Sequence, residues 1–559
     1  MTIEWRSGRT RADCPACGSS GDCVDVLVAD SVVPKQARIT LLRCPECGVG
    51  FLRDPVAPRY EEATEVAAGM SVDYYVEQGA GVDAMASLLQ RLTPRMGRRF
   101  LEIGCGYGFA LDFARSALRW TVQGVDPSPL AAAGSVALEL PIARAYLDEE
   151  TPIGDQFDVV LASEVLEHLD DPGQLLRSIR QRMASRGILV LTTPNLAAVL
   201  PSTAESVLGR LLSPGFHLVM FDREALQSIL LRSGFAVARV EESAHSLVAF
   251  ASPAPEGLAE VSVGPRQEDR GSLRGYLAAR AETAAPSSAL ASGFAYRHFK
   301  ECVNAGLYRE ARESRLRLAV VYRERYGLEL EGPVAVDLGS NGIRPFNLTG
   351  VHFFSGMLEL NDGAAGERAA DHFAAAIAAA NETLSNQRSL GLCDGETEDL
   401  RWQSRRHLAL AWAASSPERA LGALGDLAGA TAEDGAAPGD VEATRASTFV
   451  RLVNAGAHDA AESLAETVAA ELGLDALDSR AGGALPTRAA LDALYCLAML
   501  HLQRDRWTDA AALFALTVRL AERGSDSAAD LIDLARAHEQ HARALVKASL
   551  VHADRMAAS

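Results

Sequence analysis

The spacing of apolar residues changes character twice along the chain. In the first 60 residues, short stretches such as VDVLV and ARITLL have the length and apolar content of β-strands. Between residues 99 and 253, apolar runs such as RFLEI and FDVVLA alternate with segments of helical spacing, a pattern typical of a parallel sheet with helices on both faces. From about residue 254 onward the pattern is almost wholly helical and rich in Ala, Leu, Arg and Glu.

These changes predict a multidomain protein, in keeping with 559 residues at roughly 150 per domain. Pro253, Pro255 and Gly257 interrupt the pattern where the α/β region gives way to the helical region. The expected order is a small β domain, a helical connector, an α/β domain and an all-α domain, at residues 1–60, 61–98, 99–253 and 254–559.

A local phrase recurs within the helical region. VNAGLYREA at 303–311 returns as VNAGAHDAA at 453–461, and RDRWTDA at 504–510 is a looser copy. Each copy lies between two segments of helical spacing, so we expect a turn between two helices. The phrase resembles the turn of tetratricopeptide (TPR) helical hairpins. Because the copies are unevenly spaced, an ordinary Ala-rich α-helical domain remains an alternative.

Composition excludes several classes of protein. A hydrophobic fraction of 48% with 23% charged residues is ordinary for a globular chain with a sizeable core. The formal charge of −19 disfavours a nucleic-acid partner, because such binding depends on cationic contacts to phosphate. The chain shows neither the apolar run of a secretory signal nor the ~18 apolar residues of a membrane helix. We therefore expect a cytoplasmic protein with mostly reduced cysteines.

Four of the cysteines form two copies of one motif. Cys14 and Cys17 lie in CPACG, and Cys44 and Cys47 lie in CPECG. Each CxxC turn offers two thiolates, and two such turns supply the four sulfurs of a closed structural Zn²⁺ site. A zinc ribbon at 1–60 is the leading interpretation, and a thioredoxin-like redox pair or unrelated cysteines are the alternatives. Cys23 falls outside the pattern.

Three glycines at alternate positions follow the first strand of the α/β region. Gly104, Gly106 and Gly108 form GCGYG between RFLEI and a helix that begins FALDF. Glycine lets a backbone lie against a ligand that side chains would exclude. Phe109 stands where the dinucleotide fingerprint GxGxxG requires a third glycine, so a pyrophosphate cradle is disfavoured. The next strand ends at Asp126, a carboxylate suited to the two hydroxyls of a ribose.

With these motifs in register, the chain resembles a class I S-adenosylmethionine-dependent methyltransferase. LEIGCGYG, VQGVDPSP, FDVVLASEVLEHLDDP and GILVLTTPN occur in the family's order and spacing. The most similar subgroup is that of ubiquinone-biosynthesis-like O-methyltransferases and of small-molecule and sugar methyltransferases with an N-terminal zinc ribbon. The resemblance covers residues 1–250 and implies a Rossmann-like sheet. The segment VAVDLGSNG at 334–342 looks like a second glycine turn, but we interpret it as a loop because no matching helix follows.

The resemblance implies a binding site for S-adenosylmethionine (SAM). Glu102 and the three glycines are expected at its methionine end, and Asp126 at its ribose. Leu147 and Asp148 are expected beside the adenine, and Ser163 near the sulfonium.

A cluster of acidic and imidazole side chains follows the fourth strand. On a helix, Glu164, Glu167 and His168 would share one face at i, i+3 and i+4, and His217 could close the site from the other side. The similar ExxEH motif of ubiquinone-type O-methyltransferases and small-RNA 3′-end methyltransferases binds Mg²⁺ or a related ion. Alternatively, the two glutamates orient helices, and His168 or His217 serves as a general base or lines the cleft. Glu167, His168 and His217 are the candidate catalytic residues.

The leading functional hypothesis is a methyltransferase that acts on a hydroxyl of a small molecule, sugar or glycan precursor. RNA methylation is a second hypothesis, which the acidic charge disfavours. A non-catalytic helical scaffold that retains a methyltransferase fold is a third. The helical region 254–559 is expected to bind a protein partner or a second copy of the chain.

Overall fold

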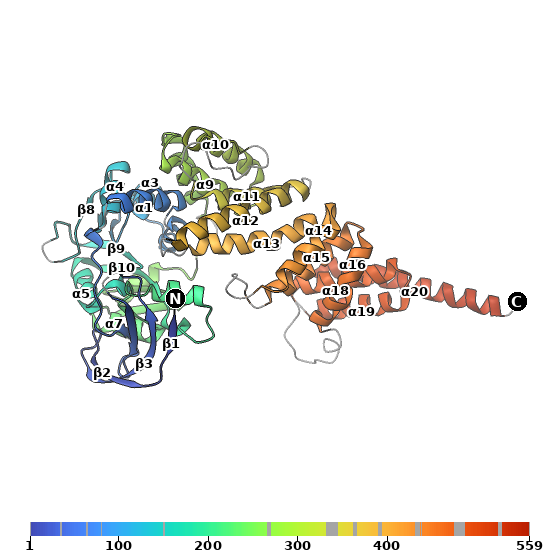
Figure 1. The fold of residues 1–559 in the computed structure, drawn as a ribbon, viewed down its shortest axis with the longest axis horizontal. Helices are drawn as coiled ribbons and strands as arrows, with labels where there is room; N and C mark the ends of the chain where they lie inside the picture. Colours follow the sequence, from blue (N-terminus) through green and yellow to red (C-terminus); the bar gives the residue numbers. More distant parts are fainter. Residues whose placement is uncertain are drawn as a thin grey trace. The chain divides into compact units, whose positions relative to one another are not determined.

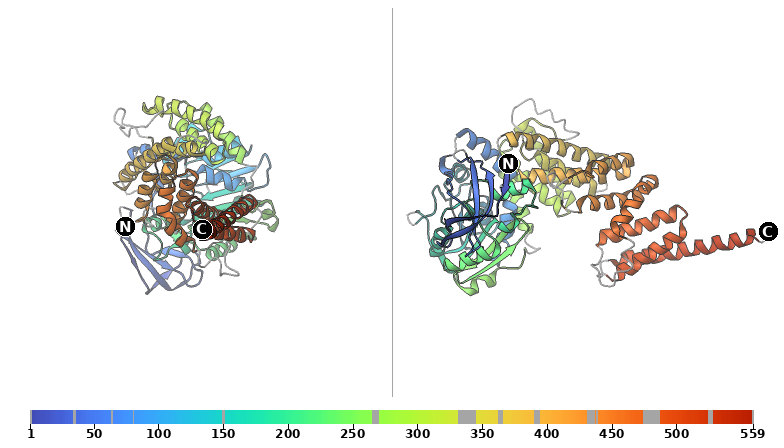
Figure 2. Two further views of the ribbon diagram at one scale, coloured as in Figure 1. Left: turned by 90° about the vertical axis from the view of Figure 1, so that its right-hand side faces the viewer. Right: turned by 60° about the horizontal axis from the view of Figure 1, so that its bottom comes forward.

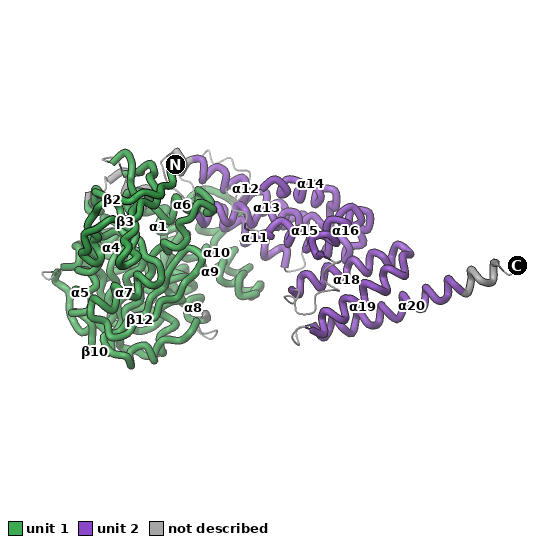
Figure 3. The backbone as a smooth tube through the Cα atoms, turned by 90° about the horizontal axis from the view of Figure 1, so that it is seen from below, with its two compact units in different colours: residues 1–332, 338–347, 387–393 green, residues 333–337, 348–386, 394–559 purple. Residues whose placement is uncertain are grey.

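The computed structural model divides into two compact units (Figure 3). Unit 1 comprises residues 1–332, 338–347 and 387–393, and unit 2 comprises 333–337, 348–386 and 394–559. The residues described are 2–33, 36–62, 65–79, 81–148, 151–264, 270–330, 345–361, 366–389, 394–430, 437, 439–473, 487–523 and 528–557. The segment 334–342, expected to be a loop, lies outside these residues.

Unit 1 begins with an antiparallel sheet in the order β1-β3-β4-β5-β11, with β2 paired to β3. Its strands β1, β2 and β3 are labelled in Figure 1. Exposure alternates regularly along β2, and in β4 Ile39 is buried between the more exposed Arg38 and Thr40. β11 comes from the α/β region, so the N-terminal sheet is completed by a distant segment. The strands are β1 (Ile3–Trp5), β2 (Arg9–Asp13), β3 (Ser20–Asp30), β4 (Arg38–Arg43), β5 (Gly50–Leu52) and β11 (Val219–Met220).

The second sheet of unit 1 has seven strands in the order β12-β13-β10-β9-β6-β7-β8. The five strands from β8 to β10 are parallel, while β13 runs antiparallel to both β10 and β12. The predicted Rossmann-like α/β sheet is therefore confirmed. The strands are β6 (Arg99–Ile103), β7 (Thr121–Val125), β8 (Ile142–Ala143), β9 (Phe157–Ser163), β10 (Met183–Pro194), β12 (Val237–Glu242) and β13 (Ser246–Ser252).

Helices cover both faces of this sheet. Successive residues of a strand face opposite sides, and the apolar side chains on both sides are buried against helices. Val160 and Leu189 pack in one core with helices α5 and α7 and with Phe51 of the N-terminal sheet. Val159 and Val190 pack in the other core, with α2, α3 and α8. The helices named here and their neighbours are α1 (Glu65–Gln78), α2 (Val82–Leu89), α3 (Phe109–Ser116), α4 (Pro129–Ala137), α5 (Pro172–Arg182), α6 (Glu205–Leu212), α7 (Arg223–Arg232) and α8 (Arg270–Thr283).

The remaining described chain is helical, as predicted (Figure 2). The turns of the repeated phrase connect helix pairs, with Gly306, Gly456 and Asp505 in the left-handed conformation at equivalent places. Unit 1 also contains α9 (Ala289–Asn304) and α10 (Tyr308–Tyr326). Unit 2 holds α11 (Leu348–Asn361), α12 (Gly366–Ser389), α13 (Gly395–Ser415), α14 (Pro417–Leu427), α15 (Asp440–Asn454), α16 (His458–Leu472), α18 (Arg488–Gln503), α19 (Trp507–Glu522) and α20 (Ala529–Ala557). Within the residues described, we find no helix with the length and apolar character needed to span a membrane.

Candidate functional site

The glycine loop joins β6 to α3 at the carboxyl ends of the parallel strands. Gly104, Gly106 and Gly108 all have positive φ, at 68°, 49° and 87°. A Cβ on Gly106 would lie 2.6 Å from the hydroxyl of Tyr75, and a Cβ on Gly104 would lie 2.5 Å from Val165. Glycine is therefore required here both by the backbone conformation and by the close approach of other side chains.

Asp126 lies directly after β7 and is almost fully buried. Its Oδ2 accepts a hydrogen bond from the amide of Gly106 at 2.8 Å, and its Oδ1 accepts from the amide of Ser128 at 2.8 Å. These bonds fix the carboxylate beside the glycine loop. The expected neighbours Gly106 and Asp126 are thus brought together.

Glu102, at the end of β6, is a buried carboxylate with an unmet hydrogen-bonding need. The side chain is 3% exposed, and its Oε2 has no hydrogen-bond partner in the structure. Burial, reinforced by the nearby charge of Asp126, raises the pKa of Glu102 well above its usual range. A cationic group placed against Oε2 would relieve this desolvation cost.

Tyr75 of α1 covers the glycine loop and was not identified from the sequence. Its ring stacks on Phe109 with centroids 6.4 Å apart, and its hydroxyl is the atom that a Cβ on Gly106 would meet. Burial raises the pKa of Tyr75, with Glu102 and Asp126 close enough to add to the shift. No periodic or motif signal distinguishes Tyr75 in the sequence, because it reaches the loop from a separate helix.

The three remaining cofactor candidates lie in different surroundings. Ser163 ends β9, and its hydroxyl lies 2.8 Å from that of Thr192. Leu147 packs partly buried against the core. Asp148 is exposed, and its Oδ1 accepts a hydrogen bond from the hydroxyl of Thr151 at 2.7 Å, so this side chain stabilises a turn.

A second set of side chains meets beyond β9. Glu167, His168 and His217 each offer one ligand atom, and these atoms lie within 4.8 Å of one another. Nε2 of His168 is 4.0 Å from Oε1 of Glu167, a buried oxygen without a hydrogen-bond partner. The other oxygen of Glu167 accepts from the hydroxyl of Thr193 at 3.0 Å. The two imidazole rings are 4.9 Å apart in an edge-to-face arrangement.

Backbone carbonyls set the tautomer of both histidines. Nδ1 of His168 lies 3.0 Å from the carbonyl oxygen of Phe216, and Nδ1 of His217 lies 2.7 Å from that of Leu211. Because a carbonyl can only accept, a proton on each Nδ1 satisfies these contacts and leaves a lone pair on each Nε2; at His168 that proton is shared with the hydroxyl of Tyr60, which lies 2.7 Å from Nδ1. Imidazoles held in this way are typical metal ligands.

The pKa shifts at this set favour neutral imidazoles. Burial lowers the pKa of His168, and burial together with His168 lowers the pKa of His217 to about 4. Burial and the charge of Glu164 raise the pKa of Glu167 well above its usual range. A divalent cation would offset the cost of burying this carboxylate as an anion.

The helix assumed for residues 164–168 is not formed. Glu164 has a φ of 54°, in the left-handed region, and only Leu166–His168 form a 3-10 turn. Glu164 accepts a hydrogen bond from the hydroxyl of Thr192 at 2.8 Å and is not a member of the close set. Non-glycine residues in this conformation are costly and concentrate at functional sites.

The N-terminal sheet is hydrogen-bonded to the backbone segment that follows His217 of this second set. The amide of Leu52 in β5 donates to the carbonyl of Leu218 at 2.8 Å, and the amide of Leu218 donates to the carbonyl of Glu167 at 2.7 Å. The hydroxyl of Tyr60, which follows the same sheet, lies 2.7 Å from Nδ1 of His168. Tyr60 belongs to no sequence motif, so the sequence alone does not indicate its place beside His168.

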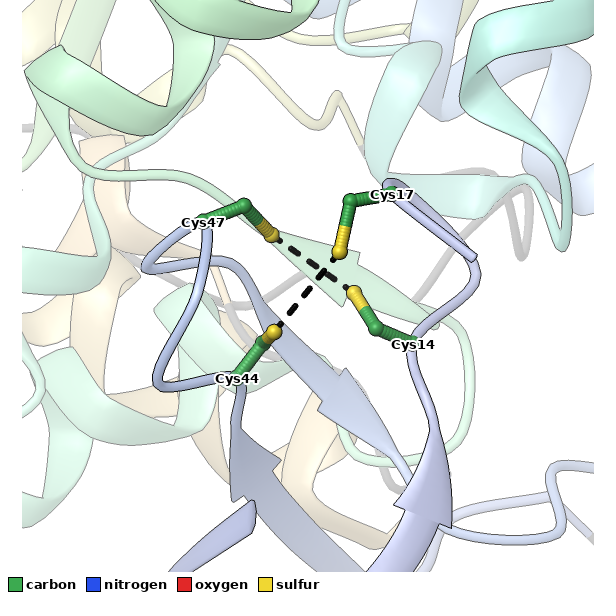
Figure 4. A group of neighbouring side chains, drawn as sticks. All are labelled: Cys14, Cys17, Cys44 and Cys47. Atoms are coloured by element: carbon green, nitrogen blue, oxygen red, sulfur yellow. Dashed lines mark hydrogen bonds between the residues drawn. The ribbon is translucent and has the colours of Figure 1, made fainter. Parts of the chain in front are cut away.

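The four cysteines of the CxxC turns converge at one end of the N-terminal sheet (Figure 4). The sulfur atoms of Cys14 and Cys47 are 3.6 Å apart, and those of Cys17 and Cys44 are 3.8 Å apart. Four sulfurs at the usual Zn–S distance of about 2.3 Å around a tetrahedral ion are separated by about 3.8 Å. The cluster is therefore compatible with zinc, and no ligand position is left open for chemistry.

Comparison with known proteins identifies the α/β region. A methyltransferase domain family matches residues 75–240. Ubiquinone biosynthesis O-methyltransferases from Azorhizobium caulinodans and from a Caulobacter species are 37% and 36% identical, over 19% and 22% of this chain. These alignments cover 43% and 53% of the relatives, so the chain spans about half of their length.

A solved methyltransferase from Mesorhizobium loti is also similar, with 22% identity and a TM-score of 0.26 over 31% of this chain and 100% of that one. The family match agrees with the order of the seven-stranded sheet and with the GCGYG loop beside Asp126. Residues 75–240 therefore form a class I S-adenosylmethionine-dependent methyltransferase domain.

Proposed function

We propose that this protein is a SAM-dependent O-methyltransferase that acts on a hydroxyl of a small aromatic molecule. The observation that carries this proposal is the set formed by Glu167, His168 and His217 beside the glycine loop. Val165, which contacts Gly104, directly precedes the turn that carries Glu167 and His168. A cofactor site and a candidate cation site are therefore neighbours.

The residues around the glycine loop fit SAM. The unpartnered Oε2 of Glu102 is suited to the ammonium group at the methionine end, and Asp126 is suited to the ribose hydroxyls. Tyr75 would exclude water above the loop. When bound, SAM supplies an electrophilic methyl group, and the protein must align the acceptor with it and keep water away.

The second set provides what a hydroxyl acceptor needs. Methylation of a hydroxyl requires loss of its proton, which a base or a bound cation promotes. Nε2 of His168, Nε2 of His217 and Oε1 of Glu167 would hold a cation such as Mg²⁺, which would lower the pKa of the acceptor hydroxyl. Without a cation, either Nε2 lone pair is placed to accept the proton.

The relatives narrow the acceptor class. They are named as O-methyltransferases of ubiquinone biosynthesis, which favours a hydroxylated aromatic ring over the sugar or glycan also considered from the sequence. The formal charge of −19 disfavours RNA methylation. We also propose that the four cysteines bind a structural Zn²⁺ and that residues 254–559 bind a protein partner.

Calorimetry with SAM, and product detection with a panel of catechols and phenols in Mg²⁺, would test the proposal. Wild type should bind SAM and release S-adenosylhomocysteine with a hydroxylated aromatic acceptor. Asp126→Ala should lose about 10–100-fold in SAM affinity, as expected for a charged hydrogen-bonding group. A folded wild type that binds no SAM at millimolar concentration would refute the proposal.

A further inference from the structure

Helix α1, which carries Tyr75 over the glycine loop, is anchored by a buried carboxylate. Glu77 is fully buried, two residues beyond Tyr75. Its Oε1 accepts hydrogen bonds from the hydroxyl of Tyr326 at 2.6 Å and from Nε of Arg325 at 3.1 Å. Its Oε2 accepts from the amide of Phe346 at 2.8 Å. The carboxylate therefore joins α1 to α10 and to a segment that lies far beyond the methyltransferase domain.

Neighbouring contacts reinforce the same attachment. The side-chain amide of Gln78 donates to the carbonyl of Phe346 at 2.9 Å, and the ring of Phe346 packs edge-on against Tyr74 at 5.4 Å. The side-chain amide of Asn347 donates to the hydroxyl of Ser292 in α9 at 3.0 Å. The end of α1 is thus held by α10 and by Phe346, both outside residues 75–240.

Helix α9 completes the attachment through a close backbone approach. A Cβ on Gly293 would lie 2.3 Å from the carbonyl oxygen of Val76, so α9 packs directly on the backbone of α1. Phe294 of α9 meets Phe109 edge-on at 5.7 Å, and Phe109 is the residue on which Tyr75 stacks. Helix α9 therefore contacts both the backbone of α1 and the aromatic ring on which Tyr75 stacks.

We propose that Glu77 is a positioning residue for cofactor binding: by joining α1 to α10 and Phe346, it holds Tyr75 over the glycine loop. This inference rests on the proposed binding of SAM at that loop. It implies that the cofactor pocket is completed by α9, α10 and residues 345–347, which follow the methyltransferase domain in the sequence. Phe346 and Asn347 directly precede α11, the first described helix of unit 2.

The test uses the full-length chain with Glu77→Gln and Tyr326→Phe. Glu77→Gln keeps the shape of the side chain but turns an amide group toward donors, and Tyr326→Phe removes one hydroxyl. We expect SAM affinity to fall on the order of 10-fold in Glu77→Gln and about 3-fold in Tyr326→Phe. Amide hydrogen exchange of residues 72–78 should become faster in both variants.

Tyr276→Phe is the matched control, because its hydroxyl also donates to a buried carboxylate, that of Asp112, at 2.8 Å. It should cost similar stability but leave SAM affinity and α1 exchange unchanged. Mn²⁺ affinity at the Glu167 set should be unchanged in all three variants, which distinguishes positioning of the cofactor from general loosening of the fold.

Two results would overturn the inference. If wild type binds SAM and both Glu77→Gln and Tyr326→Phe bind it equally well, the inference fails while the proposed function stands. An equal loss of affinity in Tyr276→Phe would also overturn it, because the effect would then follow stability alone. A wild type that binds no SAM would refute the proposed function itself.

Discussion

The backbone amide of Leu218 donates to the carbonyl oxygen of Glu167 at 2.7 Å. Through this bond the segment that carries His217 is fixed to the turn that carries Glu167 and His168. The carbonyl of Leu218 in turn accepts from Leu52 of the N-terminal sheet. The candidate cation site is therefore supported by the sheet that holds the four cysteines.

Loss of zinc should weaken this cation site. We expect Cys44→Ser with Cys47→Ser to lower Mn²⁺ affinity at the Glu167 set by about 10-fold, a loss typical of a disturbed supporting shell. Metal analysis of the purified protein and calorimetry with Mn²⁺ would measure both effects. Cys23→Ser is the control, because Cys23 is buried in the same sheet but lies outside the cysteine cluster. Unaltered Mn²⁺ affinity after zinc loss would contradict the expectation.

Direct removal of a ligand should have a larger effect. His217→Ala deletes one Nε2 lone pair and should reduce Mn²⁺ affinity by more than about 100-fold, beyond the roughly 10–100-fold effect that is usual for a supporting residue. SAM affinity should hardly change, since no contact of His217 with the glycine loop is found among the residues described. His245→Ala offers a control histidine, placed in the turn between β12 and β13. Equal Mn²⁺ affinity in His217→Ala and wild type would exclude His217 as a ligand.

The buried carboxylate of Glu102 should make stability depend on pH. Its pKa is raised in the folded protein, so the stabilising protonated form is fully present below the unfolded pKa of about 4.3 and is lost as pH rises through the folded value. Glu102→Gln removes this loss. Its melting temperature should therefore exceed that of wild type at pH 8 and match it at pH 4, as measured by calorimetry without SAM. The reverse order would refute the assignment.

The same substitution should damage cofactor binding. A neutral amide cannot pair with the ammonium group of SAM, so Glu102→Gln should bind SAM about 10-fold more weakly at pH 8. A variant that is both more stable and weaker in binding would identify Glu102 as a residue retained for function at a cost in stability. Unchanged affinity would show that Oε2 does not meet the cofactor.

Gly106→Ala should destabilise the loop by about 1–3 kcal/mol for two reasons. Alanine is strained at the positive φ of this position, and its Cβ would clash with the hydroxyl of Tyr75. Gly97→Ala separates these causes, since Gly97 has a φ of 71° and nothing within 4 Å of its added Cβ. Chemical denaturation should show a clearly smaller loss of unfolding free energy for Gly97→Ala than for Gly106→Ala. Equal losses would show that contact with Tyr75 is unimportant.

Much of the architecture was predictable because it is encoded locally. Apolar runs marked β6 and β9, and the glycine turn marked the start of α3 at Phe109. The repeated phrase marked the turns at Gly306 and Gly456. Two CxxC motifs sufficed to predict that four sulfurs meet.

What the sequence did not reveal depends on contacts between distant segments. Val219 pairs with Phe51, but nothing in the sequence around either residue indicates that the two strands pair. Tyr60 and Tyr75 reach their sites from elements outside the recognised motifs. The shared face considered for Glu164, Glu167 and His168 depended on a helix, but Glu164 is left-handed and only Leu166–His168 form a 3-10 turn.

The pairing of β5 with β11 has a consequence for synthesis of the chain. Phe51 leaves the ribosome about 170 residues before Val219, which at 5–20 residues per second is on the order of 10–30 s. During that interval the edge of β5 that later pairs with β11 is unpaired, and an unpaired strand edge can pair with other chains. Both CxxC turns, including the one with Cys44 and Cys47, are already synthesised when Phe51 leaves the ribosome. Binding of metal by the four cysteines at this stage would thus hold the N-terminal strands in register until β11 is synthesised.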